Sequence, residues 1–504
     1  MISRTLWIRA DATSRMGIGH TMRCMALAQV WKRRGGEVCF ATRCENPMIL
    51  ERISDEGFAV LLLEDSRHRE NALEQSLSAS WGSGDQDPAW VVLDGYQFGP
   101  DYQRVVRAAA KRLLVVDDYN HLPRYEADIL LNQNIEAEHL RYQAAKECVF
   151  LLGPPYALVR REFVRRKEAK EIPFLAKRVL VTVGGSDPDR VTLKILEGLS
   201  RLEQPEMEVK IVVGPASPCG AEVKRAAAKS KLRWETLETG KDMPELMAWA
   251  DLAVAAGGST CMELAFMGVP SVVIALAENQ KQVMQGFANR GAAVALGWHA
   301  DLDPTAMAAE IDALARDRSR RESFSRLGQA LVDGLGATRV AEAMDPTDVT
   351  LRHVQEQDCE LVWRWANEPR ARAVSFSSNP IPWEDHRQWF AEKLHSKNGV
   401  FYMATNQHGT PVGQVRVDSG DSGALISVSL DRDFRSLGLG SRVIRAASER
   451  AIRERHLQRI DALIKAENSA SVRAFSKAGY KSVGKETHQG CAAVRMRYGG
   501  EVRE

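Results

Sequence analysis

Short apolar, β-prone runs alternate with helix-like segments over the first two thirds of the chain. Alternation of this kind is typical of α/β domains built on parallel sheets. A chain of 504 residues is too long for one hydrophobic core, so we expect about three domains. The expected strands are 5–10, 38–42, 90–94, 112–117, 129–132, 178–183, 208–213, 252–255 and 271–275.

Glycine-rich loops stand where two of these strands end and a helix begins. Residues 10–29 read ADATSRMGIGHTMRCMALAQ and place Gly17, Gly19 and His20 directly before a helix-like run. Residues 257–270 read GGSTCMELAFMGVP and repeat the arrangement. At the first loop the glycines let a ligand approach the backbone. At the second, exposed amides and the helix dipole favour phosphate.

Acidic residues follow two other strand candidates. Asp94 ends one of them, and Asp117 and Asp118 end the next. In an open parallel sheet the carboxyl ends of the strands line the ligand crevice. We therefore expect these carboxylates to point to one edge of the sheet.

The composition excludes several classes of protein. The 68 Lys and Arg residues nearly balance the 66 Asp and Glu residues, so nucleic acid and anionic membranes are not expected partners. No apolar run approaches the ~20 residues that span a bilayer, and no secretory signal pattern is seen, which predicts a cytoplasmic protein. The eight cysteines are scattered without a CxxC pair, so neither a disulfide framework nor a metal site is expected.

The pattern divides the chain into three parts. Two α/β domains are expected at 1–165 and 166–344, followed by a short polar linker and a third domain at 348–504. Two such α/β domains facing each other across a cleft form the GT-B arrangement. Residues 243–280 resemble the nucleotide-sugar half of the bacterial peptidoglycan N-acetylglucosaminyltransferase, whose glycine turn and helix start hold the diphosphate of UDP.

Six ordered blocks between about residue 3 and residue 330 carry a narrower resemblance. They read RADATSRMGIGHTMRC, VVLDGYQF, LLVVDDYNHLPRYEADILLNQN, LLGPPYALVRREF, VTVGGSDP and GGSTCMELAFMGVPSVVIALAENQ. Together they resemble the UDP-sugar hydrolases of pseudaminic acid biosynthesis. The resemblance implies cleavage of UDP-2,4-diacetamido-2,4,6-trideoxy-β-L-altropyranose to UDP and the free sugar with inversion. Arg190 departs from the pattern, which has an asparagine there.

The resemblance gives catalytic roles to three residues. His20 is then the general base for the attacking water, although its position alone equally fits an ordinary hydrogen bond at a helix start. Asn279 would orient the water or an acetamide, or be a plain loop residue. Asp11 would hold His20 or the sugar, or cap its loop.

The same resemblance implies a set of substrate-binding residues along both loops. Glu263 would bind the uridine ribose, although with Thr260 it also fits a capping box. The full set is Gly17, Gly19, Arg23, Asp94, Tyr96, Gly185, Ser186, Gly258, Ser259, Thr260, Glu263 and Gln280.

The last third resembles the GNAT acetyltransferases, an α+β fold. Residues 424–454 read ALISVSLDRDFRSLGLGSRVIRAASERAIRE, and residues 460–484 read IDALIKAENSASVRAFSKAGYKSVG. Phe475 stands where many members have a tyrosine that protonates the departing thiolate, so water or another group does that step here, or no donor is needed. The residues implied to bind acetyl-CoA are Arg435, Leu437, Gly438, Leu439, Gly440, Ser441, Asn468 and Ser471.

The two resemblances together imply one function. The chain would N-acetylate the 4-amino group of a UDP-sugar with acetyl-CoA and then hydrolyse the product. Two alternatives stay open: a UDP-sugar glycosyltransferase with an acetyltransferase of separate purpose, and a hydrolase with a regulatory CoA-binding module. The sequence does not set the oligomeric state.

Overall fold

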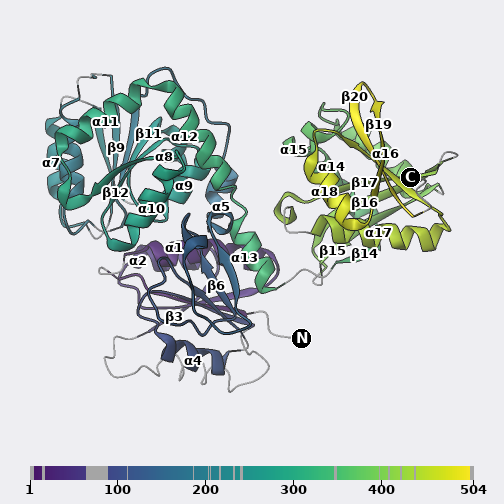
Figure 1. Cartoon of the computed structure of the whole chain (residues 1–504), viewed down its shortest axis with the longest axis horizontal. Coiled ribbons are helices and arrows are strands. Elements are labelled where there is room, and N and C mark those ends of the chain that lie inside the picture. Colours follow the sequence, from purple (N-terminus) through teal and green to yellow (C-terminus); the bar gives the residue numbers. More distant parts are fainter. Residues whose placement is uncertain are drawn as a thin grey trace. The chain divides into compact units, whose positions relative to one another are not determined.

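The computed structural model divides into two compact units, Met1–Met344 and Asp345–Glu504 (Figure 1). Each unit is described by itself. The structure describes residues 5–13, 17–63, 89–110, 112–185, 187–202, 204, 206–214, 217–230, 233–238, 242–345, 349–396, 398–406, 409–420, 423–435 and 439–499.

The first unit contains two parallel sheets with the same winding. In the first sheet the strand order is β3-β2-β1-β4-β5-β6-β7, and in the second it is β10-β9-β8-β11-β12-β13. In each sheet the chain adds strands in one direction and then continues on the other side of the first strand. This change of direction lies between β1 and β4 in the first sheet and between β8 and β11 in the second. Open α/β sheets bind ligands at such topological switch points. The bounds of the first sheet are β1 Thr5–Ala10, β2 Glu37–Thr42, β3 Ala59–Leu62, β4 Trp90–Asp94, β5 Leu113–Val116, β6 Ile129–Asn132 and β7 Val149–Leu152. Those of the second are β8 Arg178–Thr182, β9 Glu208–Val213, β10 Arg233–Glu238, β11 Leu252–Ala256, β12 Ser271–Ala275 and β13 Val294–Trp298.

Helices cover both faces of these sheets. In the second sheet, alternate residues of the central strands enter two different hydrophobic clusters, each closed by its own helices. Burial on both faces explains why the strands read as nearly continuous apolar runs. The helices are α1 Gly19–Arg33, α2 Pro47–Asp55, α4 Pro100–Ala109, α5 Arg161–Arg166, α6 Val191–Leu199, α7 Gly220–Lys229, α8 Met243–Trp249, α9 Thr260–Met267, α10 Glu278–Asn289, α11 Pro304–Arg316, α12 Arg318–Leu331 and α13 Gly336–Met344.

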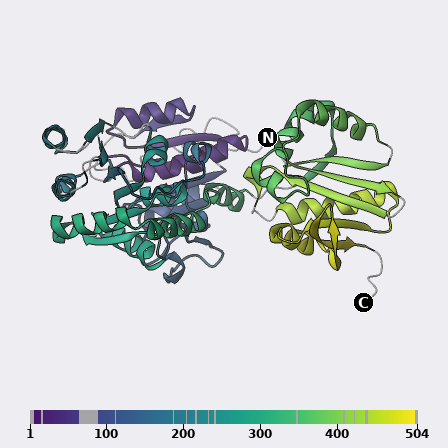
Figure 2. The ribbon, with the colours of Figure 1, turned by 90° about the horizontal axis from the view of Figure 1, so that it is seen from above.

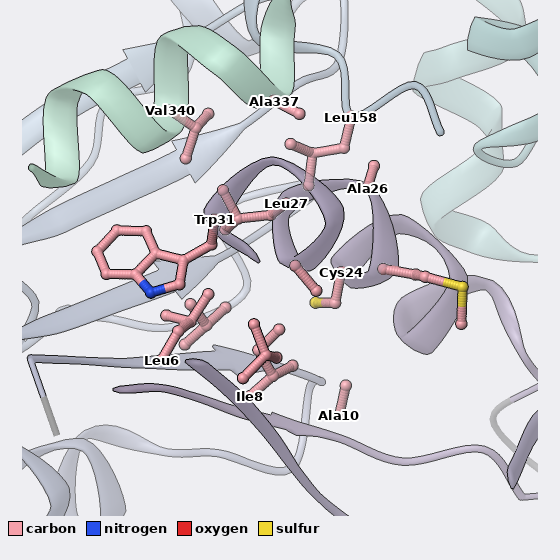
Figure 3. Close-up of a cluster of buried hydrophobic side chains, with 14 of the residues drawn as sticks. Leu6, Ile8, Ala10, Cys24, Ala26, Leu27, Trp31, Leu158, Ala337 and Val340 are labelled. Carbon is pink, nitrogen blue, oxygen red and sulfur yellow. The ribbon is translucent and has the colours of Figure 1, made fainter. Parts of the chain in front are cut away.

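The helix α13 follows the second sheet in sequence but packs in the core of the first. Figure 3 shows Ala337 and Val340 of α13 above Leu27 and Trp31 of α1, with Ile8 of β1 below. Trp31 is only 2% exposed in this cluster, and burying a side chain of this kind contributes about 1.5–3 kcal/mol. The last helix of the unit therefore completes the core around β1 and α1.

The second unit is an α+β domain on a mixed sheet of order β14-β15-β16-β17-β18-β20-β19, in which only β17 and β18 run parallel. Along β15, Tyr402 faces a core with α17, whereas Phe401 and Met403 face a core with α14 and α16, and Figure 2 shows helices on both sides of the strands. The strands are β14 Thr350–His353, β15 Gly399–Thr405, β16 Pro411–Gly420, β17 Gly423–Leu430, β18 Ile460–Lys465, β19 Lys481–His488 and β20 Cys491–Tyr498; the helices are α14 Cys359–Ala366, α15 Pro369–Val374, α16 Trp383–Leu394, α17 Leu439–Arg455 and α18 Ser469–Ala478.

The structure confirms the expected fold class, two Rossmann-like domains in a GT-B arrangement followed by an α+β domain. All nine strands expected from the sequence are present. The sequence missed β3, β7, β10 and β13, which are the four edge strands of the two parallel sheets. Edge strands are covered less completely: Leu62 of β3 is 56% exposed and Val149 of β7 is 50% exposed. All eight cysteines are free, and no described helix is long and apolar enough to cross a membrane.

The departure at Arg190 has a backbone consequence. Arg190 precedes α6 in the left-handed conformation, with φ 59° and ψ 32°, and its side chain pairs at the surface with Glu222. Asparagine tolerates this conformation better than arginine does.

We predict that Arg190→Asn raises the melting temperature of the chain by about 1–3 °C, because it relieves roughly 1 kcal/mol of backbone strain. Arg190→Lys is the control, since it keeps the strain and should give no increase. Thermal unfolding followed by circular dichroism compares the three proteins. A lower melting temperature for Arg190→Asn than for Arg190→Lys would show that the pair with Glu222 outweighs the strain.

Candidate functional site

A cleft of about 1500 Å³ lies between the carboxyl ends of the two parallel sheets of the first unit. His20 and Tyr96 line it from the first sheet, and Gly258, Glu263 and Asn279 line it from the second. The loops after β1, β4, β8 and β11 all reach it. The cleft therefore joins the switch points of both sheets, where ligand binding is expected.

Glycine-containing loops of the two sheets face each other across this cleft. A Cβ atom placed on Gly19 would lie 3.8 Å from Ser259 Oγ, and one placed on Gly185 would lie 3.0 Å from Ile18 Cγ1. Because α1 begins at Gly19, this contact sets His20 in the first turn of α1, close to the opposite loop. Gly17 also lines the cleft, in a left-handed conformation with φ 73°.

A buried carboxylate holds the imidazole of His20. The distance from His20 Nδ1 to Asp94 Oδ1 is 2.6 Å, and Asp94 is fully buried. Burial alone would raise the pKa of Asp94, but the charges and hydrogen bonds of Arg23 and His20 hold that pKa below its usual range. An ionised carboxylate can only accept, so Nδ1 donates and Nε2 keeps the lone pair of a base.

Arg23 ties this carboxylate to a second one. Its Nε donates to Asp94 Oδ2 over 2.7 Å, and one terminal nitrogen donates to Asp118 Oδ1 over 2.7 Å. Burial lowers and the two carboxylates raise the pKa of Arg23, with a net rise. The sequence placed Arg23 and Asp94 among the substrate-binding residues. The structure shows that they contact each other and His20, with Asp94 beneath the cleft surface.

Tyr96 links the two halves of the cleft. Its hydroxyl donates to Asp118 Oδ2 over 2.6 Å and accepts from Asn279 Nδ2 over 2.8 Å. Its ring packs edge-on against His20 at 5.1 Å. Burial is the main cause that raises the pKa of Tyr96, so the hydroxyl keeps its proton. Asn279 thus lies beside the His20 network although it belongs to the second sheet.

Asp11 does not contact His20. It accepts from the backbone N–H of Arg43 over 2.7 Å and from Gln97 Nε2 over 3.1 Å, and it pairs with Arg9. The carboxylate that orients His20 is Asp94, which sequence reasoning placed at the cleft but did not pair with the histidine. Asp11 fixes its own loop and lines the cleft.

The start of α9 is open to the cleft. Ser259 precedes the helix and makes no side-chain cap, and the capping box between Thr260 and Glu263 does not form. Glu263 instead accepts from Arg160 over 2.9–3.0 Å. Burial is the largest cause of the raised pKa of Glu263, and Arg160 opposes it.

The start of α6 is closed by an internal anion. Asp187 accepts from the backbone N–H groups of Val191 over 2.7 Å and Thr192 over 2.9 Å. The first-turn amides of α6 are therefore already satisfied. Of the two glycine-rich helix starts in this half, α9 is the one available to an anionic ligand.

Close backbone contacts fix the loop that precedes α9. A Cβ on Gly257 would lie 2.8 Å from the carbonyl oxygen of Gln280, so only glycine fits. The side chain of Gln280 accepts from the N–H of Leu276 over 3.0 Å and holds the turn before α10. Gly214, which sequence reasoning missed, is likewise a position where only glycine fits, because a Cβ there would lie 2.4 Å from the carbonyl oxygen of Gly185. The sequence feature that could have identified it is a glycine directly after an expected strand.

In the second unit, β17 and β18 separate soon after they begin. They pair only at Ala424 with Ile460 and at Leu425 with Asp461. Beyond these pairs the two strands diverge, which leaves a gap at their carboxyl ends. One edge of β17 therefore offers unpaired backbone groups to an extended ligand.

Several residues implied to bind acetyl-CoA lie near this gap. Arg435 donates to the carbonyl oxygen of Leu430 over 3.0 Å, and Leu439, Gly440 and Ser441 begin α17. Asn468 caps α18 by accepting from the N–H of Ser471 over 3.1 Å. Three expected site residues, Ser186, Leu437 and Gly438, lie outside the described residues.

In the described part of the chain, no group of three or more His, Cys, Asp or Glu side chains is placed to hold a metal ion.

Comparison with family models assigns two parts of the chain. Residues 178–331 match the glycosyltransferase family 28 C-terminal domain, and residues 348–481 match the acetyltransferase (GNAT) domain. The chain is thus similar to the C-terminal domain of family 28 glycosyltransferases over its second parallel sheet and to GNAT acetyltransferases over most of its second unit.

Curated relatives cover different shares of the chain. An uncharacterized protein of Methanocaldococcus jannaschii is 24% identical over 423 residues, 81% of this chain and 82% of that protein. The spore coat polysaccharide biosynthesis protein SpsG of Bacillus subtilis is 25% identical over 66% of this chain and 95% of its own length. The UDP-2,4-diacetamido-2,4,6-trideoxy-β-L-altropyranose hydrolase of Campylobacter jejuni is 25% identical over 38% of this chain and 65% of that protein. The name of the Campylobacter jejuni relative agrees with the resemblance found in the sequence.

The geometry predicts the tautomer of His20. In Asp94→Asn, the amide oxygen will turn to Arg23 and the amide NH₂ to the imidazole, so the ring proton moves from Nδ1 to Nε2. Nitrogen-15 NMR of the imidazole at pH 8 distinguishes the two forms. The control is Asp101→Asn, whose side chain is 92% exposed on α4. An Nδ1–H ring that persists in Asp94→Asn would contradict the assignment.

Proposed function

We propose that the first unit is a UDP-sugar hydrolase that acts on UDP-2,4-diacetamido-2,4,6-trideoxy-β-L-altropyranose. The observation that carries the proposal is the hydrogen bond between His20, in the first turn of α1, and the buried, ionised Asp94. This bond leaves His20 Nε2 free to act as a base on one wall of the cleft. The opposite wall carries the open start of α9. The named hydrolase relative supports the choice of substrate.

The residues perform the reaction as follows. His20 Nε2 takes a proton from a water whose oxygen attacks the anomeric carbon, and the bond from that carbon to the diphosphate oxygen breaks. Asp94 stabilises the imidazolium that forms. A base of this kind contributes about 10²–10⁴ in rate. The backbone N–H of Gly258 already donates to the carbonyl oxygen of Ala256 over 2.8 Å, so the N–H groups of Ser259 and Thr260 at the start of α9 balance the charge on the departing UDP.

The sugar would lie between His20 and Asn279. The side chain of Asn279 is held by Tyr96, so it is fixed in place to contact the water or an acetamido group. Glu263 would accept from a ribose hydroxyl while Arg160 holds its carboxylate. Attack by water from the His20 side, opposite the diphosphate, gives inversion at the anomeric carbon.

For the second unit we propose acetyl-CoA-dependent N-acetylation of the 4-amino group of the same UDP-sugar. The gap between β17 and β18 and the glycine-containing start of α17 support binding of the coenzyme. Phe475 is buried against Tyr480 at 4.9 Å, and the Tyr480 hydroxyl is bonded to Ser448. Phe475 has no proton to donate and the Tyr480 hydroxyl is engaged with Ser448, so water or another group protonates the thiolate of coenzyme A, or it leaves without a donor.

A second candidate for the first unit is a UDP-sugar glycosyltransferase, because the matched family model of residues 178–331 is a glycosyltransferase domain. The two reactions differ in the acceptor. A hydrolase releases UDP with water alone, whereas a transferase needs a second sugar.

We predict that the purified chain releases UDP from the diacetamido sugar without an added acceptor and in the presence of EDTA. His20→Asn should lower the rate by about 10²–10⁴ while the UDP-sugar still binds. Proton and phosphorus NMR follow the products, and calorimetry follows binding. His139→Asn is the control, because this histidine is a surface residue paired with Glu136. UDP release that requires an added sugar would favour the transferase, and a His20→Asn variant with normal turnover would refute the role of His20.

The 4-amino sugar tests the second activity. Acetyl-CoA should convert it to the diacetamido sugar and then to free sugar and UDP. If UDP release required acetyl-CoA but no acetylated product formed, the result would favour a regulatory CoA-binding module instead.

A substitution at Gly440 tests coenzyme binding without disturbing the fold. A Cβ there would make only ordinary contacts, 3.5 Å to Leu430 and 3.7 Å to Ala474. We therefore predict that Gly440→Ala keeps or raises the stability of the helix, by up to about 1 kcal/mol, while CoA affinity falls at least about tenfold because the methyl group lies at the coenzyme site. Calorimetry and thermal unfolding measure the two effects. Gly484→Ala on β19, with open space around it, should change neither, and CoA affinity in Gly440→Ala equal to the wild type would move the coenzyme elsewhere.

A further inference from the structure

One of the five arginines that line the cleft of the first unit differs from the other four. Arg43 has no side-chain hydrogen bond or ion pair to any residue that the structure describes, and its Nε is buried without a partner. A guanidinium in this state is available to a ligand. The other four arginines are held by carboxylates of the protein: Arg23 by Asp94 and Asp118, Arg52 by Glu162, Arg160 by Glu263, and Arg161 by Glu56.

We propose that Arg43 selects the UDP-sugar that the cleft accepts. Its guanidinium donates to the carbonyl oxygen of the acetamido group at position 4 of the sugar, and its charge repels a sugar that carries an ammonium group there. Hydrolysis therefore waits until the amine has been acetylated. This inference rests on the hydrolysis proposed above and assigns the choice between the acetylated sugar and its amine precursor to one residue.

Backbone pairing places Arg43 on the same wall of the cleft as His20. The N–H of Ala12 donates to the carbonyl oxygen of Arg43 over 2.9 Å, and the N–H of Arg43 donates to Asp11 Oδ1 over 2.7 Å. A parallel bridge between Ala12 and Cys44 continues the pairing of β1 with β2 beyond both strands. The loop that follows β1 leads from Ala12 to His20. Both side chains thus belong to loops at the carboxyl ends of neighbouring strands.

The proposed reaction determines how the sugar lies between the two walls. Its anomeric carbon lies near His20, and its diphosphate lies at the start of α9 on the second sheet. Position 4 of a pyranose is across the ring from the anomeric carbon, so a group there points away from the diphosphate and toward the loops of the first sheet. Asp11, Arg43 and Gln97 line the cleft from these loops.

The buried charges around Arg43 leave a net positive site. Asp11 pairs with Arg9 of β1 and also accepts from Gln97, so this carboxylate is already neutralised. Tyr102 of α4 lies in the same group of charges, and burial raises its pKa to about 12, so its hydroxyl keeps its proton at neutral pH. The charge of Arg43 is the one that this buried group does not balance.

Three further carboxylates line the cleft on this side, and all are exposed. Glu45 follows Arg43 in its own loop, and Glu51 and Asp55 belong to α2. Water and salt screen the charges of exposed side chains much more strongly than those of buried ones. These carboxylates therefore offset the charge of Arg43 only in part.

The acetylated sugar and its precursor differ at the group that meets this charge. An acetamido group is neutral, and its carbonyl oxygen accepts hydrogen bonds from a guanidinium. An ammonium group has no lone pair to accept them. The precursor would therefore leave the buried donor of Arg43 without a partner and would place two like charges side by side, and both effects disfavour its binding.

The test measures UDP release by phosphorus NMR from each sugar, with the full chain and without acetyl-CoA. At pH 7 the wild type should show a kcat/KM at least about 100-fold higher for the diacetamido sugar than for the 4-amino sugar. Arg43→Gln should lower this ratio at least about tenfold. Arg43→Lys keeps the charge without the planar fork, so it should still reject the amine while the KM for the diacetamido sugar rises. Arg104→Gln is the matched control, because this arginine pairs with Asp101 on the exposed face of α4.

The pH dependence separates charge repulsion from other causes. In the wild type the ratio should fall as the pH rises through the pKa of the sugar amine, because the amine loses its charge while Arg43 keeps its own. In Arg43→Gln the ratio should change much less. Any change in the activity of the base His20 affects both sugars and cancels in the ratio. Proton NMR of the free amino sugar gives the pKa of its amine.

The outcomes are distinguishable. A ratio in Arg43→Gln equal to that of the wild type would refute the role of Arg43, and equal ratios in Arg43→Lys and Arg43→Gln would refute charge repulsion. Calorimetry with UDP alone shows that each variant is folded, because UDP lacks the sugar that Arg43 contacts. A wild-type chain that releases UDP equally from both sugars would refute the selection, whereas one that releases no UDP from the diacetamido sugar would refute the proposed hydrolysis itself.

Discussion

The buried guanidinium of Arg23 is the interaction on which the candidate hydrolase site depends. Removing a guanidinium and two carboxylates from water costs several kcal/mol per ion, and only full pairing offsets that cost. Arg23 meets Asp94 on one side and Asp118 on the other. Through Asp94 it fixes the proton on His20, and through Asp118 it fixes the hydroxyl of Tyr96. One cation thus sets the chemistry of the base and the position of its neighbour.

The winding of the sheets brings these groups together. His20 follows β1 and Asp94 ends β4, and these two strands are neighbours although 74 residues separate the side chains. The second sheet repeats the order and places the glycine turns after β8 and β11 in the same way. Because both sheets have the same topology, each presents its loops at the carboxyl ends of its strands, and the cleft forms between these two sets of loops. The two walls differ only in the side chains that the loops carry.

The sequence predicted the parts of this arrangement that depend on local physics. Buried central strands are apolar on both faces, and glycines mark the loops, so β1, β4 and the start of α1 were recognisable. The pairing of Asp94 with His20 was not, because Asp11 lies nearer in sequence and only the strand order decides between them. Edge strands such as β7 were missed because solvent covers part of them and weakens their apolar pattern.

Two helix starts show another limit of local patterns. Gly184-Gly185 and Gly257-Gly258 look alike in sequence, but Asp187 folds back onto the amides of α6 and leaves α9 open. Similarly, Thr260 and Glu263 have the spacing of a capping box, yet Arg160, 103 residues away, takes the carboxylate. A partner distant in sequence overrides the local preference in both cases.

The return of α13 to the first sheet has a consequence for synthesis. Arg34 at the end of α1 pairs with Glu342 of α13, 308 positions later, and Trp31 is covered by the same helix. At 5–20 residues per second, the ribosome needs roughly 15–60 s to make the segment that separates them. During that time α1 has been synthesised but α13 is not yet there to cover its apolar face. The nascent chain therefore exposes the core around β1 and α1 for longer than the core of the second sheet.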